Sequence, residues 1–177
     1  MQQNNEILVT RQDFESYKEI CSNTDESKKL LPHALAAQMF DIKPVIGDSF
    51  YYDVIKNQHE ENYRKLINGE VYENQRGEEV LFKGLKLAII YYSHARYVMD
   101  KDVNDTPFGM RHKTSEFSER VSDKRIDKMQ NQSRAMGLSS LSDVQKYLSA
   151  KKDVFPLYRK CSTGNKKQVY KIKGAGK

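Results

Sequence analysis

The sequence of 177 residues lacks tryptophan and has only four prolines and two cysteines. Cys21 and Cys161 are far apart, with no CxxC pair and no histidine nearby, so neither a disulfide framework nor a zinc site is expected. No run of about 18 apolar residues occurs, which argues against a transmembrane helix. The first ten residues lack the basic and then apolar form of a signal peptide. We therefore expect no membrane partner and a chain that starts in the cytoplasm.

The common short motifs of enzymes are also missing. The sequence has no GxxxxGK[ST] or GxGxxG phosphate loop, no HExxH zinc motif and no GxSxG nucleophile elbow. None of its four histidines belongs to a metal-ligand pattern, and His94 is expected to be packed or hydrogen-bonded rather than catalytic. The pairs Glu60-Glu61 and Glu78-Glu79 lie in polar segments, which predicts solvated charges. The sequence thus predicts no enzyme activity, no cofactor and no metal.

The net charge of +6 is unevenly distributed. Residues 1–100 carry a net charge of −4, whereas residues 151–177 carry +8, with nine lysines and arginines against one aspartate. A basic end on a nearly neutral body is typical of an arm that meets nucleic acid or an acidic protein face, and equally of a solubilising tail. We therefore divide the chain into a domain of residues 1–150 and a basic C-terminal arm of residues 151–177. The candidate partner or DNA contacts of this arm are Lys151, Lys152, Arg159, Lys160, Lys166, Lys167, Lys171 and Lys173.

Hydrophobic periodicity predicts a mainly α-helical domain. Thr10 is the expected N-cap of a short first helix, and a second helix is expected after Asp25. Pro32 must bend this second helix or mark a later start, and Pro44 is expected to break it. The apolar residues that continue the helical spacing predict further helices around residues 45–54, around 63–67, over 85–99 and from Ser122 to about residue 148.

Two of these helices stand out. Residues 85–99 are apolar nearly all round, as expected of a helix in the middle of a bundle. The helix after Ser122 has a thin apolar stripe interrupted by Gly137, and would span about 40 Å if unbroken. The fold class is therefore a small helical bundle with a long central helix, a long C-terminal helix and an extended basic arm.

Two other segments are less regular. The runs Val71-Tyr72 and Val80-Leu81-Phe82 flank a polar loop, which suggests a short β-hairpin or merely an excursion before the central helix. The connection over residues 100–121 is much longer than the usual length of about 4–6 residues, so it is expected to be functional or disordered. Its aromatic residues argue against plain disorder, because exposed aromatic side chains need a cover.

Two tyrosine-rich clusters lie at residues 50–52 and 91–97. Aromatic side chains of this kind can stack on nucleic-acid bases. Both clusters, however, lie among isoleucines and leucines in segments predicted to be helical. We therefore expect them to pack in the core or at an interface, where tyrosine is half-buried with its hydroxyl on a partner.

Three segments, taken in order, resemble a known protein family. They are AQMFDIKPVIGDSFYYDVI (37–55), LFKGLKLAIIYYSHARYV (81–98) and DTPFGMRHKTSEFSERVSDKRI (105–126). Their order and spacing resemble the head–tail connector, or ring, proteins of tailed phages, particularly of crAss-like and other Bacteroidales phages. The resemblance covers about residues 6–150, and the basic arm departs from the family pattern.

This resemblance implies a non-enzymatic structural protein of the virion neck, made in the cytoplasm of the bacterial host. Copies would pack into a homo-oligomeric ring, typically twelvefold, that extends the DNA channel below the portal. The implied partners are other copies, the portal protein, the next connector or tail protein and, non-specifically, DNA in the channel. The candidate subunit or portal contacts are Thr106, Pro107, Phe108, Gly109, Met110, Arg111, His112 and Lys113. The alternative is a nucleic-acid-binding module that acts through the basic arm.

Overall fold

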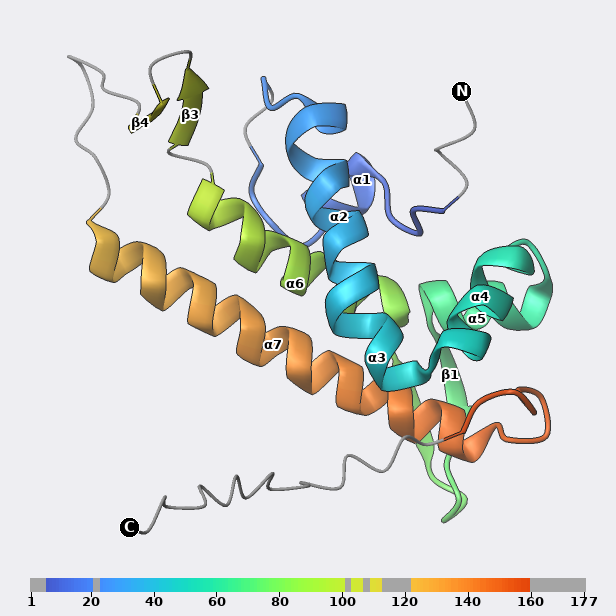
Figure 1. Ribbon diagram of the computed structural model, residues 1–177. Coiled ribbons are helices and arrows are strands. Elements are labelled where there is room, and N and C mark those ends of the chain that lie inside the picture. Colours follow the sequence, from blue (N-terminus) through green and yellow to red (C-terminus); the bar gives the residue numbers. More distant parts are fainter. Residues whose placement is uncertain (1–5, 21–22, 101–102, 107–108, 113–121, 160–177) are drawn as a thin grey trace, which may run out of the picture.

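The chain folds around two long helices that lie side by side and run in opposite directions (Figure 1). The computed structural model describes residues 6–20, 23–100, 103–106, 109–112 and 122–159. The long helices are α6 (Leu85–Asp100) and α7 (Asp123–Ala150). The elements before them are α1 (Arg11–Glu15), η1 (Glu26–Leu30), α2 (Leu31–Ala37), η2 (Gln38–Ile42), α3 (Lys43–Ile46), α4 (Asp48–Lys56), α5 (Glu61–Asn68), β1 (Glu70–Glu73) and β2 (Glu79–Phe82). The predicted mainly helical bundle is confirmed.

Helix α6 forms the centre of this bundle, as its sequence predicts. Ten of its residues are buried, among them Ile89 and Ile90 with no exposed surface, because α7 covers one side of the helix and α2 another. Helix α7 is continuous from its N-cap Ser122 through Gly137, and it buries only one stripe. The wide apolar surface of α6 and the thin stripe of α7 thus correspond to a central and a peripheral position.

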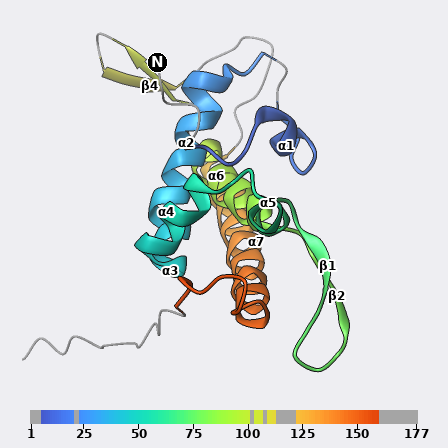
Figure 2. The ribbon, with the colours of Figure 1, turned by 90° about the vertical axis from the view of Figure 1, so that its right-hand side faces the viewer.

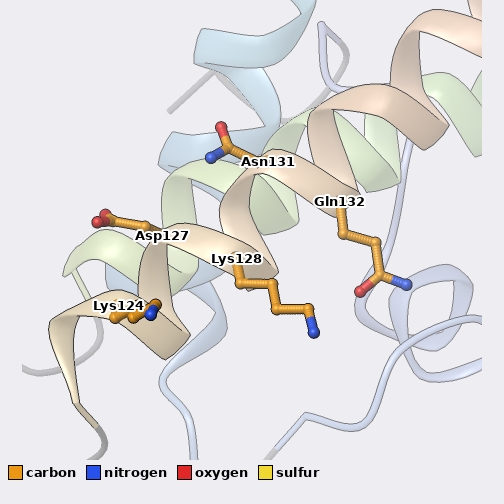
Figure 3. A pocket seen from close by; sticks show the side chains of 5 residues that line it. All are labelled: Lys124, Asp127, Lys128, Asn131 and Gln132. Atoms are coloured by element: carbon orange, nitrogen blue, oxygen red, sulfur yellow. The ribbon is translucent and has the colours of Figure 1, made fainter.

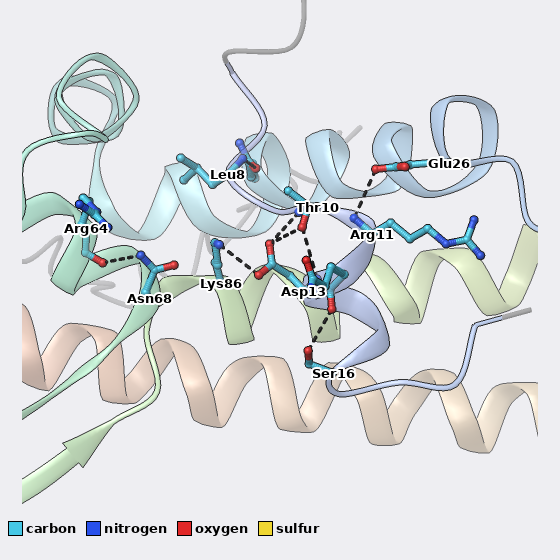
Figure 4. Close-up of polar contacts among 11 residues, drawn as sticks. Leu8, Thr10, Arg11, Asp13, Ser16, Glu26, Arg64, Asn68 and Lys86 are labelled. Atoms are coloured by element: carbon cyan, nitrogen blue, oxygen red, sulfur yellow. Dashed lines mark hydrogen bonds and ion pairs between the residues drawn. The ribbon is translucent and has the colours of Figure 1, made fainter. Parts of the chain in front are cut away.

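The N-terminal helix α1 is fixed by a capping box (Figure 4). The Asp13 carboxylate accepts hydrogen bonds from the backbone N–H of Thr10 at 2.8 Å and from its hydroxyl at 2.9 Å. The ammonium group of Lys86, on α6, lies 3.1 Å from the same carboxylate. Burial alone would raise the pKa of Asp13, but the Thr10 backbone N–H, Lys86 and the Thr10 hydroxyl outweigh it and lower this pKa.

This network predicts a pH-dependent contribution to stability. Because the pKa of Asp13 in the folded chain lies below its ordinary value of 3.8, the contribution is present above that value and is lost as the pH falls through the folded pKa. We expect Asp13→Asn to lower the free energy of unfolding by about 1 kcal/mol at about pH 7, and by much less near pH 2.

Urea unfolding at the two pH values measures this difference. Glu15→Gln is the matched control, because Glu15 is an exposed carboxylate on the same helix and its pair with Arg11 is worth about 0.5 kcal/mol or less. A loss for Asp13→Asn that is the same at both pH values would show that the carboxylate charge contributes nothing.

The helical path from η1 to α3 corrects one prediction. In η1 and η2 the backbone makes i→i+5 bonds, and each of these wide π-helical turns is followed by an α-helical segment with a proline in its first turn, Pro32 in α2 and Pro44 in α3. A proline has no N–H to donate and its ring needs space over the preceding turn, both of which a wide turn accommodates. Pro32 therefore marks a later α-helical start. The prediction that Pro44 breaks the helix is wrong, since the path ends only at Gly47, where φ is +90°.

The two described hairpins lie at opposite ends of the α6–α7 pair (Figure 1). The predicted hairpin β1–β2 is confirmed, and its inner face places Tyr72 and Phe82 against Tyr147 of α7, with ring centroids 5.0 and 4.3 Å away. The other hairpin, β3 (Val103–Thr106) with β4 (Gly109–His112), lies in the long connection and was not expected. Its strands contain Asn, Asp and Gly, which have low β-propensity and gave no strand signal.

The residues that follow α7 return to the core. Phe155 is 1% exposed and packs edge-to-face on Phe50 at 5.8 Å and on Tyr63 at 5.5 Å. Tyr158, 7% exposed, packs edge-to-face on Phe50 at 5.6 Å. The bundle therefore includes the first residues of the predicted arm, and the arm beyond residue 159 lies outside the described residues.

Candidate interaction surface

The candidate contacts in the long connection fall on the hairpin β3–β4. Thr106 is the last residue of β3, and it pairs with Gly109, the first residue of β4. Met110, Arg111 and His112 complete β4, whose side chains are not described. The candidates Pro107, Phe108 and Lys113 lie outside the described residues. The role of this segment as a subunit or portal contact stays a prediction.

The candidate contacts of the arm divide in the same way. Lys151 is the half-buried C-cap of α7, and Lys152 and Arg159 are exposed beside the buried Phe155 and Tyr158. The others, outside the described residues, are Lys160, Lys166, Lys167, Lys171 and Lys173. The three described cations flank a segment that packs against the core through Phe155 and Tyr158, and their role as partner or DNA contacts stays a prediction.

A groove that sequence reasoning did not find runs between the helical path η2–α3 and the middle of α7. It has a volume of about 380 Å³. Its lining residues come from four elements and are Phe40, Asp41, Pro44, Val45, Tyr92, Arg134, Ala135 and Leu138. We refer to it below as the α3–α7 groove. Most of these side chains are apolar, which is typical of a surface that binds another protein or an apolar ligand.

The floor of the groove forms where α6 and α7 approach closely. Tyr92 of α6 is 8% exposed, and a Cβ added at Gly137 of α7 would lie 3.0 Å from its ring. One turn away the buried side chain of Ser133 lies 2.9 Å from Nδ1 of His94. Burial raises the pKa of Tyr92, and the nearby Asp41 raises it further. Gly137 thus leaves room on α7 for the Tyr92 ring. His94 is packed and hydrogen-bonded, as predicted.

One edge of the groove carries paired charges. The Asp41 carboxylate is 12% exposed and lies 2.6 Å from the guanidinium of Arg96, which itself stands 5.9 Å from the centroid of the Phe40 ring. Arg134, across the groove, is 51% exposed and 3.9 Å from the other oxygen of Asp41. Because Arg96 already occupies the carboxylate at short range, the more distant guanidinium of Arg134 has hydrogen-bonding capacity left for another acceptor.

Two large side chains beside these charges are exposed. Phe40 is 72% exposed and Leu138 is 65% exposed. The fold gives these residues no cover on the described chain, although both line the groove together with the buried Tyr92. A sequence signal did exist, since Leu138 continues the thin apolar stripe of α7 after Gly137, but the sequence did not reveal which side of α7 stays uncovered.

The other features give no support for a catalytic site. A polar depression on the first turns of α7 is lined by Lys124, Asp127, Lys128, Asn131 and Gln132, whose side chains point in different directions (Figure 3). Over the described ranges, no group of three or more histidines, cysteines, aspartates or glutamates is placed to hold a metal ion. None of the helices in those ranges is long and apolar enough to cross a membrane. We take the α3–α7 groove as the candidate surface because it combines apolar lining with two large exposed side chains.

The tyrosine clusters also pack as predicted. Phe50, Tyr51 and Tyr92 are buried in the main core, and Tyr97 is buried in a smaller cluster. Tyr91 is half-buried, and Tyr52 is largely exposed, with 69% of its surface accessible. A stack of bases would need exposed ring faces, which these four buried side chains do not offer.

Comparison with known proteins places the chain in a family. No curated protein and no solved structure matches it. Residues 42–168 match a family described as a family of unknown function, DUF6712. The match covers most of the chain and includes the elements from α3 through α7 that carry most of the groove. The chain therefore belongs to the DUF6712 family.

Proposed function

We propose that this protein is a structural subunit of a phage head–tail connector, which forms a ring with other copies below the portal. The observation that carries the proposal is the α3–α7 groove, an apolar surface on which Phe40 and Leu138 are largely exposed. Exposed apolar surface does not stabilise a monomer in water, whereas a neighbouring subunit that covers this surface removes it from water and stabilises the complex. The resemblance of three segments to phage ring proteins supports the same proposal.

The two ends of the bundle suit the remaining contacts of a connector. A ring subunit must meet its neighbours at its sides, and the portal and the next connector or tail protein at its ends. The hairpin β3–β4 lies at one end of the α6–α7 pair and is the proposed portal contact (Figure 1). The arm after residue 159, with its basic residues, is the proposed contact for an acidic face of a partner or for DNA in the channel.

Native mass spectrometry tests the proposal on the full chain mixed with the portal protein of the phage genome that encodes it. We expect a complex in which the chain and the portal are present in equal copy number. A chain that binds neither itself nor the portal would contradict the proposal. So would binding to DNA alone that falls steeply with salt concentration and is lost on truncation after Arg159, since that result would favour the nucleic-acid-binding alternative.

A further inference from the structure

The hairpin β1–β2 exposes an unusual outer face. Val71 and Leu81 are cross-strand partners and are 58% and 61% exposed. The next pair on this face, two residues along each strand, is Glu73 with Glu79, both exposed. Like charges directly opposite each other destabilise a hairpin. This face therefore combines an exposed apolar pair with two carboxylates, and neither carboxylate has a cation as its cross-strand partner.

The α3–α7 groove has complementary chemistry. Phe40 and Leu138 offer apolar surface, and Arg134 between the helices is half exposed. The charges around the two surfaces are opposite in sign. Residues 70–82 contain four glutamates and one arginine, a net charge of −3. At the groove, Arg96 and Arg134 face the single carboxylate of Asp41, which leaves a net charge of +1. Surfaces with these properties attract one another.

The two surfaces also lie on different sides of the molecule. In Figure 2 the helices α2 and α3 lie to one side of the α6–α7 pair and the hairpin β1–β2 lies to the other. Two complementary surfaces on different sides of one subunit cannot meet within it. A contact between two such surfaces would be head-to-tail, and a contact of this kind closes into a ring when the rotation per subunit divides the circle.

We propose that the outer face of the β1–β2 hairpin of one copy docks in the α3–α7 groove of the next copy. Val71 and Leu81 cover Phe40 and Leu138, and Arg134 meets the carboxylates of Glu73 and Glu79. The occupant of the groove is thus a second copy of this chain. The inference rests on the proposed ring and names the surfaces that join its subunits.

Chemical cross-linking tests the contact. In a background of Cys21→Ser and Cys161→Ser, one preparation carries Leu138→Cys and another carries Leu81→Cys, and a short bismaleimide is added to each alone and to the mixture. The experiment is done with the chain alone and with the portal present. We expect dimers only in the mixture, because each variant supplies one side of the contact. A chain that carries both substitutions should give a ladder of larger products.

Leu157→Cys is the matched control, since Leu157 is a leucine of similar exposure, 52%, outside both surfaces. Its mixture with Leu138→Cys should give at least about tenfold less dimer. Arg134→Glu should lower the cross-linked fraction of the mixture by about tenfold, and Glu73→Lys with Glu79→Lys in the other copy should restore it. Lys128→Glu, an exposed reversal on α7 outside the groove, should have little effect. Circular dichroism confirms that each variant keeps its helical content.

Three results would overturn the inference. The first is as much dimer from the Leu157→Cys mixture as from the Leu81→Cys mixture. The second is a strong dimer from Leu138→Cys alone, which would indicate a twofold contact, and the third is no dimer from any mixture with or without the portal. The proposed function is tested separately by the same samples. Portal binding without these cross-links leaves the connector proposal standing and removes this contact. A ladder without portal binding keeps this contact and removes the portal as a partner.

Discussion

Replacing Phe155 by alanine is expected to lower the free energy of unfolding by about 3–5 kcal/mol. Phe155 follows the last helix, in a stretch where the charge pattern predicted an arm, yet it is 1% exposed. Its ring contacts the rings of Phe50 and Tyr63 edge-to-face and lies 6.3 Å from that of Tyr147. Removing it leaves a cavity between α4, α5 and the end of α7, because these three elements meet through this side chain.

Urea unfolding of Phe155→Ala measures this loss, and Phe155→Leu provides a milder variant if the alanine form does not fold. Leu157→Ala is the control, because Leu157 lies two residues away and is 52% exposed, so its loss should stay below about 1 kcal/mol. Truncation separates the two parts of the arm in the same way. A chain that stops after Arg159 should keep its stability, whereas one that stops after Ala150 should lose at least as much as Phe155→Ala. Equal stability of the two truncated chains would refute the assignment of Phe155 to the core.

The substitution Gly69→Ala is expected to lower the free energy of unfolding by about 4 kcal/mol. Gly69 ends α5 with φ of +97° and ψ of 161°, a region that only glycine occupies without strain of about 1–3 kcal/mol. A Cβ there would also lie 2.3 Å from the carbonyl oxygen of Phe82. Gly84, which follows β2 at the same end of the hairpin, is its counterpart, with φ of +86° and a Cβ position 2.4 Å from the carbonyl oxygen of Ile67. The two glycines let the chain cross itself at the base of the hairpin.

Gly47→Ala is the matched control for this substitution. Gly47 has φ of +90° and ψ of 145°, close to the values at Gly69, but nothing lies within 4 Å of its Cβ position. Gly47→Ala should therefore lower the free energy of unfolding only by the backbone strain, about 2 kcal/mol. The difference between the two alanine variants, measured by urea unfolding, isolates the clash at the base of the hairpin. A difference of zero would mean that the backbone moves apart at no cost.

Local signals predicted the elements of this fold well. The N-caps Thr10 and Ser122, the helix around residues 63–67 and the extent of α6 were all predicted from short-range patterns, because caps and apolar periodicity act within one or two helical turns. The hairpin β1–β2 was one of two alternatives for its segment and is the one found.

The elements that were missed depend on contacts between distant segments. Gln38 is one such case, since its buried amide accepts a hydrogen bond from the backbone N–H of Leu8 at 2.9 Å and donates one to the hydroxyl of Tyr51 at 2.9 Å. The π-helical turns before Pro32 and Pro44 carry no sequence signal of their own.

The candidate surface could not be predicted for a related reason. Phe40 and Leu138 are almost one hundred residues apart, and periodicity shows which residues are apolar but not which of them remain uncovered once the helices pack. The residues chosen from the sequence lie instead in the hairpin β3–β4 and in the arm. Charge and loop length identified these segments. Both properties indicate that a segment is exposed to solvent, but not that its surface complements that of a partner.

Electron microscopy of the full chain assembled with its portal protein tests the ring most directly. The account predicts a closed ring with one copy per portal subunit, the α6–α7 pairs side by side, and the β1–β2 hairpin of each copy on the α3–α7 groove of its neighbour. Portal particles that carry no additional ring, while the chain remains monomeric, would contradict it.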